Sequence, residues 1–597
     1  MLELELLIKF IVMLPLAAAI LTNYWGRYLT TLATGMAFTL AAIVAANLGD
    51  NTLNIGLYTW ANLTSSSLQV GFLVDKLTTL MLLVVTGISF LVHIYTLGYM
   101  RNDPGVLRFF SYIALFTFAM LLLVLSDNLL GLFAAWELVG LVSYLLIGFW
   151  FHKDSAVKAN FKAFLVNRVA DVGLILAIAA IFMHCNSLQY STIFSSLSTL
   201  DSGTITFIAI CLFIGAMGKS AQFPLHVWLP DSMEGPTPIS ALIHAATMVT
   251  AGVYLLARME PLFSLAPNVL DLILVIGAIT SLLLGLVAIT ATDLKRIIAY
   301  STISQLGYMM VAIGSANYAI GIFHLATHAC FKALLFLGAG AVIMSLQHEQ
   351  DIRKMGNIKK YMPVTYITML LGCLALVGMP GFAGFYSKDL IIAGVAHSNS
   401  IVAPYVYWTV LVGVFITAVY TFRMFFLVFH TKERMDTIPK EIGFIMYLPL
   451  IILALASVSV GALLLEGHDA YAMALHSIQT IPFYCMLAGI ATAWICYVQY
   501  PNIPNTIVRI INPVYKLIYH KYYLDCIIAC IIVPGTRLLS NLFYKLGDRF
   551  MIETVVVNGI PKLFMMLANK LRWLQTGYLP QYILLMVVAL IIFMAVL

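Results

Sequence analysis

Charged residues are scarce in this 597-residue sequence. Asp, Glu, Lys and Arg make up 10% of it, whereas 62% of the residues are hydrophobic and the mean hydropathy is +0.98. A soluble core cannot bury so much apolar surface, but a membrane-spanning helix needs about 20 consecutive apolar residues. The composition therefore excludes a soluble enzyme and predicts an all-α polytopic membrane protein.

The sequence also lacks the patterns of common cofactor sites. Its eight cysteines include no CxxC pair, and only Cys526 and Cys530 lie four residues apart. This spacing argues against an iron–sulfur cluster or a structural zinc site. A glycine-rich nucleotide-binding loop is missing as well. We therefore expect this chain to bind no redox cofactor, nucleotide or metal.

Apolar runs of membrane-spanning length predict about 16 transmembrane helices. The first covers residues 5–22, the second 28–48 and the last 580–597. Between the second and third spans, residues 49–74 alternate between polar and apolar side chains. This alternation predicts a short external β-hairpin.

Basic residues are distributed unevenly between the connections. Connections after even-numbered spans, such as 49–74 and 185–204, are poor in Lys and Arg. Connections after odd-numbered spans hold Arg27, Arg101, Arg108, Lys153, Lys158, Lys295, Arg296, Arg353, Lys354, Lys359, Lys360, Lys432 and Arg434. Because basic loops stay in the cytoplasm, this pattern predicts a cytoplasmic location for them and an external N-terminus.

Two segments rich in helix-breaking residues interrupt the apolar pattern. The first is "GKSAQFPLHVWLPDSMEGPTP" (218–238), and the second is "GMPGFAGFYSKD" (378–389). Ordinary turns between helices are one interpretation, but each segment carries a lysine at membrane depth, Lys219 or Lys388. Paired broken helices are typical of transporters built from inverted repeats. We therefore expect two inverted five-helix repeats with broken helices.

The C-terminal part differs in character, because basic residues alternate with apolar ones over 501–579. This pattern predicts a lateral amphipathic helix along the cytoplasmic face, bent or interrupted at Pro534–Gly535 and Gly559–Pro561. A long arm that ends in an anchor favours contact with neighbouring subunits, and a loosely attached surface helix is the alternative. We expect six regions: N-terminal spans with the hairpin (1–104), a first and a second antiporter-like repeat (105–260 and 261–430), additional spans (431–500), the lateral helix (501–579) and an anchoring span (580–597).

Titratable residues inside the predicted spans are the strongest functional signal. A charge at the bilayer centre costs about 2.5–3.5 kcal/mol on insertion scales, and such residues usually mark ion or proton paths. Arg168 lies three residues before Asp171, a spacing that allows the two to pair on one helix face. The candidates for a proton relay are Glu137, Asp171, Lys219, His244, His324, His328, Lys332 and Lys388.

His324, His328 and Lys332 recur every four residues in "FHLATHACFKALLFL". They therefore share one helix face over about 12 Å. A histidine pair at this spacing can bind zinc or haem, but no carboxylate or third ligand accompanies it here. Packing explains a single buried histidine; three titratable groups on one face favour a proton relay.

Glu137 and Lys219 form a candidate switch. Burial disfavours the charged form of a lysine, whereas a nearby carboxylate favours it. If the two helices face each other, a change in the distance between Glu137 and Lys219 would therefore load or unload the lysine.

These residues lie in motifs that resemble the antiporter-like subunits of respiratory complex I, the proton-translocating NADH:quinone oxidoreductase. The matching stretches include "WELVGLVSYLLIGFW", "DLKRIIAYSTISQLGYMM" and "HLATHACFKALLFLGAG", and the tail "LRWLQTGYLPQY" is similar to the distal, L-type branch of that family. The resemblance implies that Glu137 and Lys219 form the family's glutamate–lysine pair with Asp171 beside it. It also implies that His244, His324, His328 and Lys332 connect this pair to Lys388 near the proton exit.

The resemblance further implies that FMN, iron–sulfur clusters and quinone lie in partner subunits. Expected partners are other membrane-arm subunits, contacted along the lateral helix, and lipid; we expect no nucleic acid. The expected location is the inner membrane of a bacterium. A subunit of a multisubunit Mrp-type cation/proton antiporter, a membrane subunit of a hydrogenase or bicarbonate-uptake complex, and a structural scaffold remain alternatives.

Overall fold

The computed structural model describes residues 2–62, 67–465 and 480–597. The chain forms two compact units, Met1–His520 and Lys521–Leu597. Within the described residues, sixteen helices are long and apolar enough to cross a membrane, and Pro363–Val377 is a shorter apolar helix. This confirms the all-α membrane class. One of the sixteen is the stretch Lys521–Arg572, which the sequence predicts to lie along the membrane.

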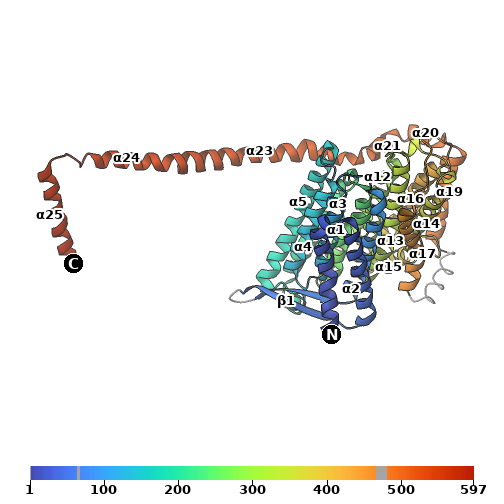
Figure 1. Cartoon of the computed structure of the whole chain (residues 1–597), viewed down its shortest axis with the longest axis horizontal. Helices are drawn as coiled ribbons and strands as arrows, with labels where there is room; N and C mark the ends of the chain where they lie inside the picture. Colours follow the sequence, from blue (N-terminus) through green and yellow to red (C-terminus); the bar gives the residue numbers. More distant parts are fainter. Residues whose placement is uncertain (1, 63–66, 466–479) are drawn as a thin grey trace. The chain divides into compact units, whose positions relative to one another are not determined.

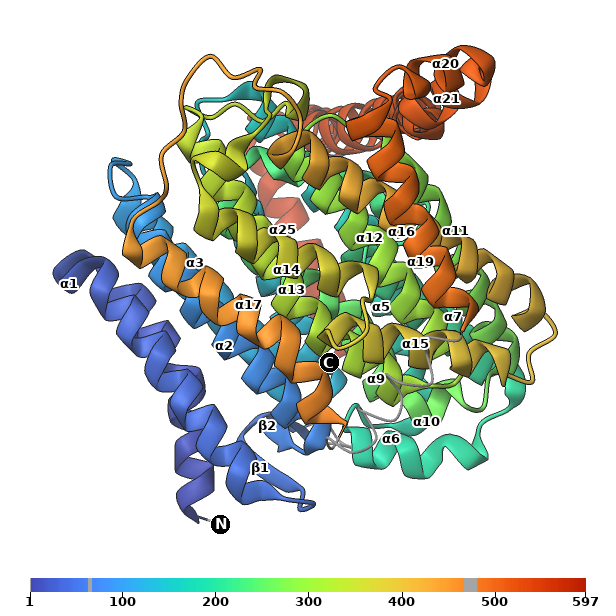
Figure 2. The same ribbon diagram turned by 90° about the vertical axis from the view of Figure 1, so that its right-hand side faces the viewer.

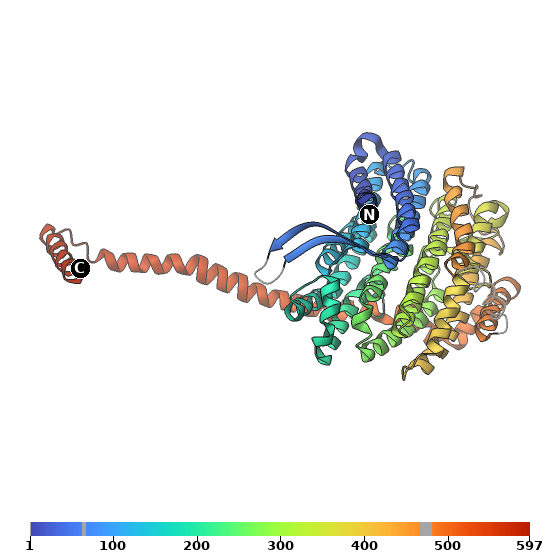
Figure 3. The same cartoon turned by 90° about the horizontal axis from the view of Figure 1, so that it is seen from below.

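The N-terminal part contains the two predicted spans and the hairpin. Helix α1 (Leu2–Leu48) bends at Gly26, whose positive φ of 64° separates the two spans. Strand β1 (Leu53–Asn62) pairs antiparallel with β2 (Ser67–Val74), which confirms the predicted hairpin. The hairpin lies across the ends of the helices in the first unit, at the same end as the N-terminus (Figures 1 and 3).

The next helices are connected by short turns. They are α2 (Lys76–Tyr99), α3 (Val106–Leu125), α4 (Leu129–Ile147) and α5 (Asp154–Cys185). The Asp75 carboxylate caps α2 by accepting from the Thr78 N–H at 2.8 Å, and it also pairs with Arg258. Burial raises the pKa of Asp75, but the Arg258 guanidinium and the hydrogen bonds from Thr78 together outweigh burial, so the pKa lies below its ordinary value. This pair joins α2 to the later helix that carries Arg258.

The first predicted break lies between α7 (Ser202–Lys219) and α8 (Thr237–Ala245). Two 3₁₀ turns, η2 (Leu225–Trp228) and η3 (Asp231–Glu234), fill it. A further interruption follows at Thr247, before α9 (Ala251–Arg258), because its backbone leaves the helical region. This interruption was not predicted, because residues 237–258 form one continuous apolar stretch.

The second predicted break separates α14 (Pro363–Val377) from α15 (Ala383–Ala396). Gly378 and Gly381 adopt positive φ values of 83° and 87° there, a conformation that glycine adopts most readily. The neighbouring helices are α11 (Pro267–Thr290), α12 (Leu294–Gly314), α13 (Tyr318–Ser345), α16 (Ala403–Phe429), α17 (Phe444–Leu464) and α19 (Ile481–Trp494). Helices α12 and α13 are largely buried, whereas α1 lies at the margin of the unit (Figure 2).

The C-terminal segment corrects one expectation. After α20 (Ile503–Ile510) and α21 (Asn512–Tyr519), the second unit is helical through α22 (Leu524–Ile527), α23 (Val533–Phe543) and α24 (Ile560–Arg572), and it ends with α25 (Leu579–Val596). Pro534–Gly535 and Gly559–Pro561 do not interrupt the helix. Each proline falls in the first turn of an α-helix that follows a π-helical segment, Ile528–Ile532 or Tyr544–Gly559, where its missing N–H breaks no regular α-helical bond. The helical region is interrupted instead at Lys521, Tyr522 and Tyr523, which have positive φ values.

Helices α11 and α12 approach each other through glycines. A Cβ added to Gly307 would lie 2.6 Å from the Gly277 carbonyl oxygen and 2.7 Å from the Ser281 nitrogen. A Cβ added to Gly314 would lie 2.5 Å from the Leu274 nitrogen. Small residues allow membrane helices to pack backbone against backbone. This contact fixes the position of α12, which carries part of the site described below.

We expect Gly307→Ala to loosen this contact and to lower stability by about 1–3 kcal/mol, because backbone atoms must move to admit the methyl group. Gly535→Ala is a matched control, since a Cβ on Gly535 in helix α23 would meet nothing within 4 Å. The thermal unfolding midpoint of the purified protein in detergent measures both effects. Equal midpoints for the two variants would show that the α11–α12 contact tolerates a side chain.

Candidate functional site

The first group of titratable residues surrounds one cavity between α4, α5 and α7. Glu137, Arg168, Asp171 and Lys219 all line it. Arg168 Nη1 pairs with Glu137 Oε1 at 2.6 Å, whereas Asp171 Oδ1 accepts from Trp136 Nε1 at 2.7 Å. The expected pairing of Arg168 with Asp171 is therefore wrong, because Arg168 reaches across to α4 and Asp171 is held by an indole of that helix.

Lys219 is the last residue of α7, and only 1% of its surface is exposed. Its ammonium lies against α4: a Cβ on Gly140 would be 2.8 Å from Nζ, and Nζ is 5.7 Å from the Trp136 ring centroid. Glu137 follows Trp136 directly, and its side chain is 18% exposed. The helices that carry Glu137 and Lys219 therefore face each other across a shared cavity, as the proposed switch requires.

His244 connects the first break to the second half of the unit. Its Nε2 lies 3.0 Å from Ser232 Oγ in the turn η3. Its ring lies 6.4 Å from the Trp228 ring and 5.8 Å from the Phe336 ring of α13, measured between centroids. His244 is thus a fully buried group between the α7–α8 break and helix α13.

The three residues of the expected ladder are all fully buried on α13. The ring centroids of His324 and His328 lie 6.3 Å apart. Lys332 Nζ donates to Ser301 Oγ of α12 at 2.5 Å, and His324 Nδ1 lies 2.8 Å from Ser387 Oγ of α15. The ladder therefore begins beside α12 and ends against the helix that carries Lys388.

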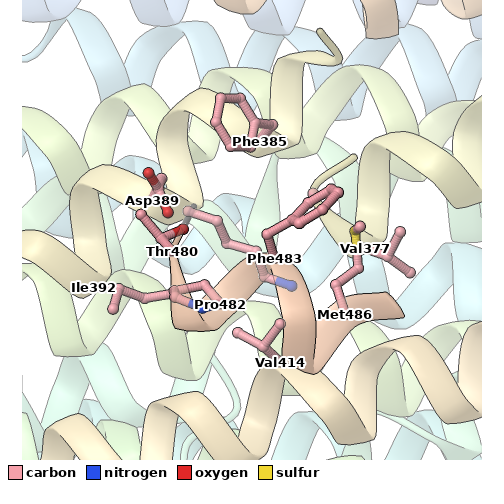
Figure 4. Close-up of a pocket in the computed structure, with 11 residues that line it drawn as sticks. Val377, Phe385, Asp389, Ile392, Val414, Thr480, Pro482, Phe483 and Met486 are labelled. Atoms are coloured by element: carbon pink, nitrogen blue, oxygen red, sulfur yellow. The ribbon is translucent and has the colours of Figure 1, made fainter. Parts of the chain in front are cut away.

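Lys388 lies in α15, just after the second break. Its Nζ donates to the Leu376 carbonyl at the end of α14, at 3.2 Å, and lies 5.1 Å from the Tyr308 ring centroid. It lines a pocket between α15, α16 and α19 (Figure 4). Phe385 and Phe483 are among the other residues that line this pocket, and Asp389 lies beside them (Figure 4).

Lys295 is buried, although the sequence predicts that it lies in a cytoplasmic connection. It lies in the first turn of α12, is 3% exposed, and donates to the carbonyls of Met233 at 2.6 Å and Gly235 at 2.8 Å. No sequence signal distinguishes Lys295 from the adjacent Arg296; only its contact with the distant break does so.

A second cavity lies next to Lys295. It is lined by polar and aromatic residues that include Tyr99, Trp150, Lys153, Glu234, Asp293 and Lys295. Burial raises the pKa of the Asp293 carboxyl, although its bonds with the start of α12 oppose this effect. Polar groups from the ends of several helices therefore line a cavity together with the buried Lys295.

Family models match two parts of the sequence. A model described as "NADH:quinone oxidoreductase/Mrp antiporter, TM" matches residues 126–418, and one described as "NADH-Ubiquinone oxidoreductase (complex I), chain 5 N-terminus" matches residues 60–110. The first match includes every candidate relay residue from Glu137 to Lys388.

Similar solved structures share the fold. A chain of the Mrp complex from Dietzia sp. DQ12-45-1b is 24% identical with a TM-score of 0.76, and the match covers 95% of this chain and 62% of that one. A chain of the membrane-bound sulfane sulfur reductase, an archaeal respiratory membrane complex, is 21% identical with a TM-score of 0.67, covering 82% of this chain and 99% of that one. At these identities the likeness concerns the fold alone.

More similar sequences cover nearly the whole chain. NADH-quinone oxidoreductase subunit L of Neisseria meningitidis serogroup B is 43% identical, with 96% of both chains covered. NADH-ubiquinone oxidoreductase chain 5 of Chondrus crispus is 39% identical over 97% of this chain and 95% of its own. The chain therefore belongs to the family of antiporter-like membrane subunits that includes NADH-quinone oxidoreductase subunit L and NADH-ubiquinone oxidoreductase chain 5.

Proposed function

We propose that this chain translocates protons as an antiporter-like subunit of NADH:quinone oxidoreductase (complex I). The observation that carries the proposal is the series of buried titratable side chains that leads from the Glu137 cavity to the Lys388 pocket. Buried ionisable groups in a membrane protein usually mark an ion or proton path. Helix α4 contacts α5 and α8, helix α5 contacts α7, and helix α13 contacts both α8 and α15.

The first part of the relay is the Glu137 cavity. Arg168 neutralises the charge of Glu137. Asp171 is then the unneutralised carboxylate that shares the cavity with Lys219. Breaking the Glu137–Arg168 pair would free a negative charge beside Lys219 and favour its protonated form. Restoring the pair would favour release of that proton. Movement of a single ion pair thus drives loading and unloading.

The second part carries the proton from His244 through Lys332, His328 and His324 to Lys388. A histidine suits this task because its neutral ring both donates and accepts a hydrogen bond. His324 contacts Ser387, the residue before Lys388, so the ladder on α13 ends beside the last lysine. Lys388 releases the proton through the pocket between α15, α16 and α19.

The energy comes from partner subunits. NADH oxidation and quinone reduction, with FMN and iron–sulfur clusters, take place there, and the chain itself transfers no electrons. Other membrane-arm subunits contact the lateral region 501–579, residues 580–597 anchor it, and lipid surrounds the spans. We propose a multi-pass location in the inner membrane of a bacterium, an external N-terminus, and two inverted repeats at 105–260 and 261–430. The hairpin and the N-terminus share one end of the first unit, which supports an external hairpin (Figure 1).

A subunit of an Mrp-type cation/proton antiporter is the second candidate, because the fold resembles that of a chain in an Mrp complex. The sequence favours complex I: identity to the Mrp chain is 24%, whereas subunit L of Neisseria meningitidis serogroup B is 43% identical. Copurification distinguishes the two candidates. If the chain belongs to complex I, subunits that hold flavin and iron–sulfur clusters should copurify with it. If it belongs to an Mrp antiporter, neither kind of subunit should copurify.

We expect Lys219→Ala and Lys388→Ala each to reduce proton pumping by about half or more, because each removes a proton carrier from the path. Pumping is measured in inverted membrane vesicles together with quinone reductase activity. Lys354→Ala is the control, since Lys354 lies outside the spans and pairs with Glu349 at 2.7 Å. Normal pumping by a fully assembled Lys219→Ala or Lys388→Ala complex would remove that lysine from the path.

The second unit supplies a separate test. Truncation after His520 removes Lys521–Leu597 and leaves the first unit complete. Because nearly all residues of the removed part are exposed in the isolated chain, we expect the truncated protein to insert in the membrane but to assemble poorly. Native gels of solubilised membranes measure the amount of intact complex. Normal assembly of the truncated chain would contradict the proposed contact between the lateral region and neighbouring subunits.

A further inference from the structure

The turn η3 in the first break is held from two sides. Lys295 of α12 donates to the Met233 and Gly235 carbonyls at 2.6 and 2.8 Å. On the other side, Lys162 of α5 binds the Asp231 carboxylate at 2.6 Å. These contacts fix a short segment whose own backbone makes few regular hydrogen bonds. The position of every side chain in the turn therefore depends on α5 and α12.

Ser232 lies inside this turn and touches His244. Its Oγ lies 2.6 Å from the Leu229 carbonyl oxygen and 3.0 Å from His244 Nε2. A carbonyl oxygen only accepts, and a serine hydroxyl has one hydrogen to donate. The hydroxyl hydrogen therefore belongs to the Leu229 bond, and Ser232 Oγ accepts from His244 Nε2–H.

This assignment fixes the tautomer of His244. A neutral imidazole has one N–H and one acceptor nitrogen. A hydrogen bond at one of the two nitrogens determines which of them carries the hydrogen. Neutral His244 thus holds its hydrogen on Nε2 and presents Nδ1 as the acceptor. Nδ1 is buried and has no hydrogen-bond partner among the described residues.

The same reasoning gives His324 the opposite tautomer. Thr327 Oγ1 donates its only hydrogen to the His324 carbonyl at 3.0 Å. In the bond between Thr327 Oγ1 and Ser387 Oγ, at 2.9 Å, Ser387 is therefore the donor. The alternative acceptor of that hydrogen is the Gly384 carbonyl at 3.4 Å. Ser387 Oγ therefore accepts from His324 Nδ1–H, and the buried Nε2 is left as the acceptor. A serine of the first break and a serine of α15, the helix after the second break, thus select the tautomers of two relay histidines.

We propose that Lys295 is a positioning residue of the relay: by holding the turn η3, it keeps Ser232 on Nε2 of His244 and makes Nδ1 the single atom at which His244 takes up and releases protons. This inference rests on the proposed function, because it concerns how His244 serves the relay. A proton that arrives at Nδ1 forms an imidazolium whose other N–H stays bound to Ser232, and the same proton leaves from Nδ1. Without the contact, the ring exchanges tautomers and presents an acceptor at the correct position for only part of the time.

The test uses the assembled complex in vesicles and measures protons moved per NADH oxidised. We expect Ser232→Ala and Lys295→Met to lower this ratio by at least about two-fold, since positioned proton transfer depends on the correct donor and acceptor atoms. Ser232→Thr keeps a hydroxyl and should retain the wild-type ratio. The double variant Ser232→Ala/Lys295→Met should be no worse than the more affected single variant, because both changes act through one contact. Lys153→Met is the control for charge, as Lys153 lines the cavity next to Lys295 but is exposed and lies against Trp150.

His244→Ala separates this inference from the proposed function. If His244→Ala lowers the ratio and Ser232→Ala does not, the tautomer inference is wrong and the relay stands. If His244→Ala leaves the ratio unchanged, His244 is not part of the relay. A low ratio in Ser232→Thr, or an equal loss in Lys153→Met, also overturns the role of the contact. If Lys295→Met prevents assembly, the comparison of Ser232→Ala with Ser232→Thr tests the contact with His244.

Discussion

The cost of placing charged and polar side chains in a membrane is the constraint on which this structure depends. The hydrocarbon core provides no hydrogen-bond partners, so each such group must find one within the protein. Glu137 is paired with Arg168, Lys332 is bound to Ser301, and Lys388 is bound to a backbone carbonyl. These partners come from different helices, so the polar groups also determine which helices lie together. Close helix packing through glycines, as between α11 and α12, encloses the series in protein.

The helix breaks follow from the same constraint. Regular membrane helices satisfy their own carbonyls, whereas a break releases carbonyls that can bind a buried cation. The first break gives the Met233 and Gly235 carbonyls to Lys295, and the second lies beside the Leu376 carbonyl that binds Lys388. The first break also supplies the serine that touches His244, and α15, the helix that follows the second break, supplies the serine that touches His324. In this protein the broken segments are therefore part of the polar interior, and they connect it to helices α5 and α12.

Periodicity and composition predicted the spans, the hairpin and both breaks, because apolar length, alternation and clustered Pro and Gly are local properties. The shared helix face of His324, His328 and Lys332 was also predictable, since it depends only on helical geometry. The partners of the charged residues could not be predicted. The sequence placed Arg168 near Asp171 by spacing, but the approach of α4 gives it to Glu137. Lys295 was predicted to lie in a loop, because the carbonyls that accept its hydrogen bonds lie some sixty positions away in the chain. Similarly, prolines 534 and 561 predicted a bend or an interruption, and the π-helical segments before them keep the helix uninterrupted.

In the proposed function the buried groups form one continuous path, and Lys332 lies at its middle. The most direct measurement is the number of protons moved per NADH oxidised by the assembled complex with Lys332→Met. The path predicts that this ratio falls while the complex remains assembled and still oxidises NADH. A ratio equal to that of the unaltered complex would show that protons cross the membrane without passing through the series described here.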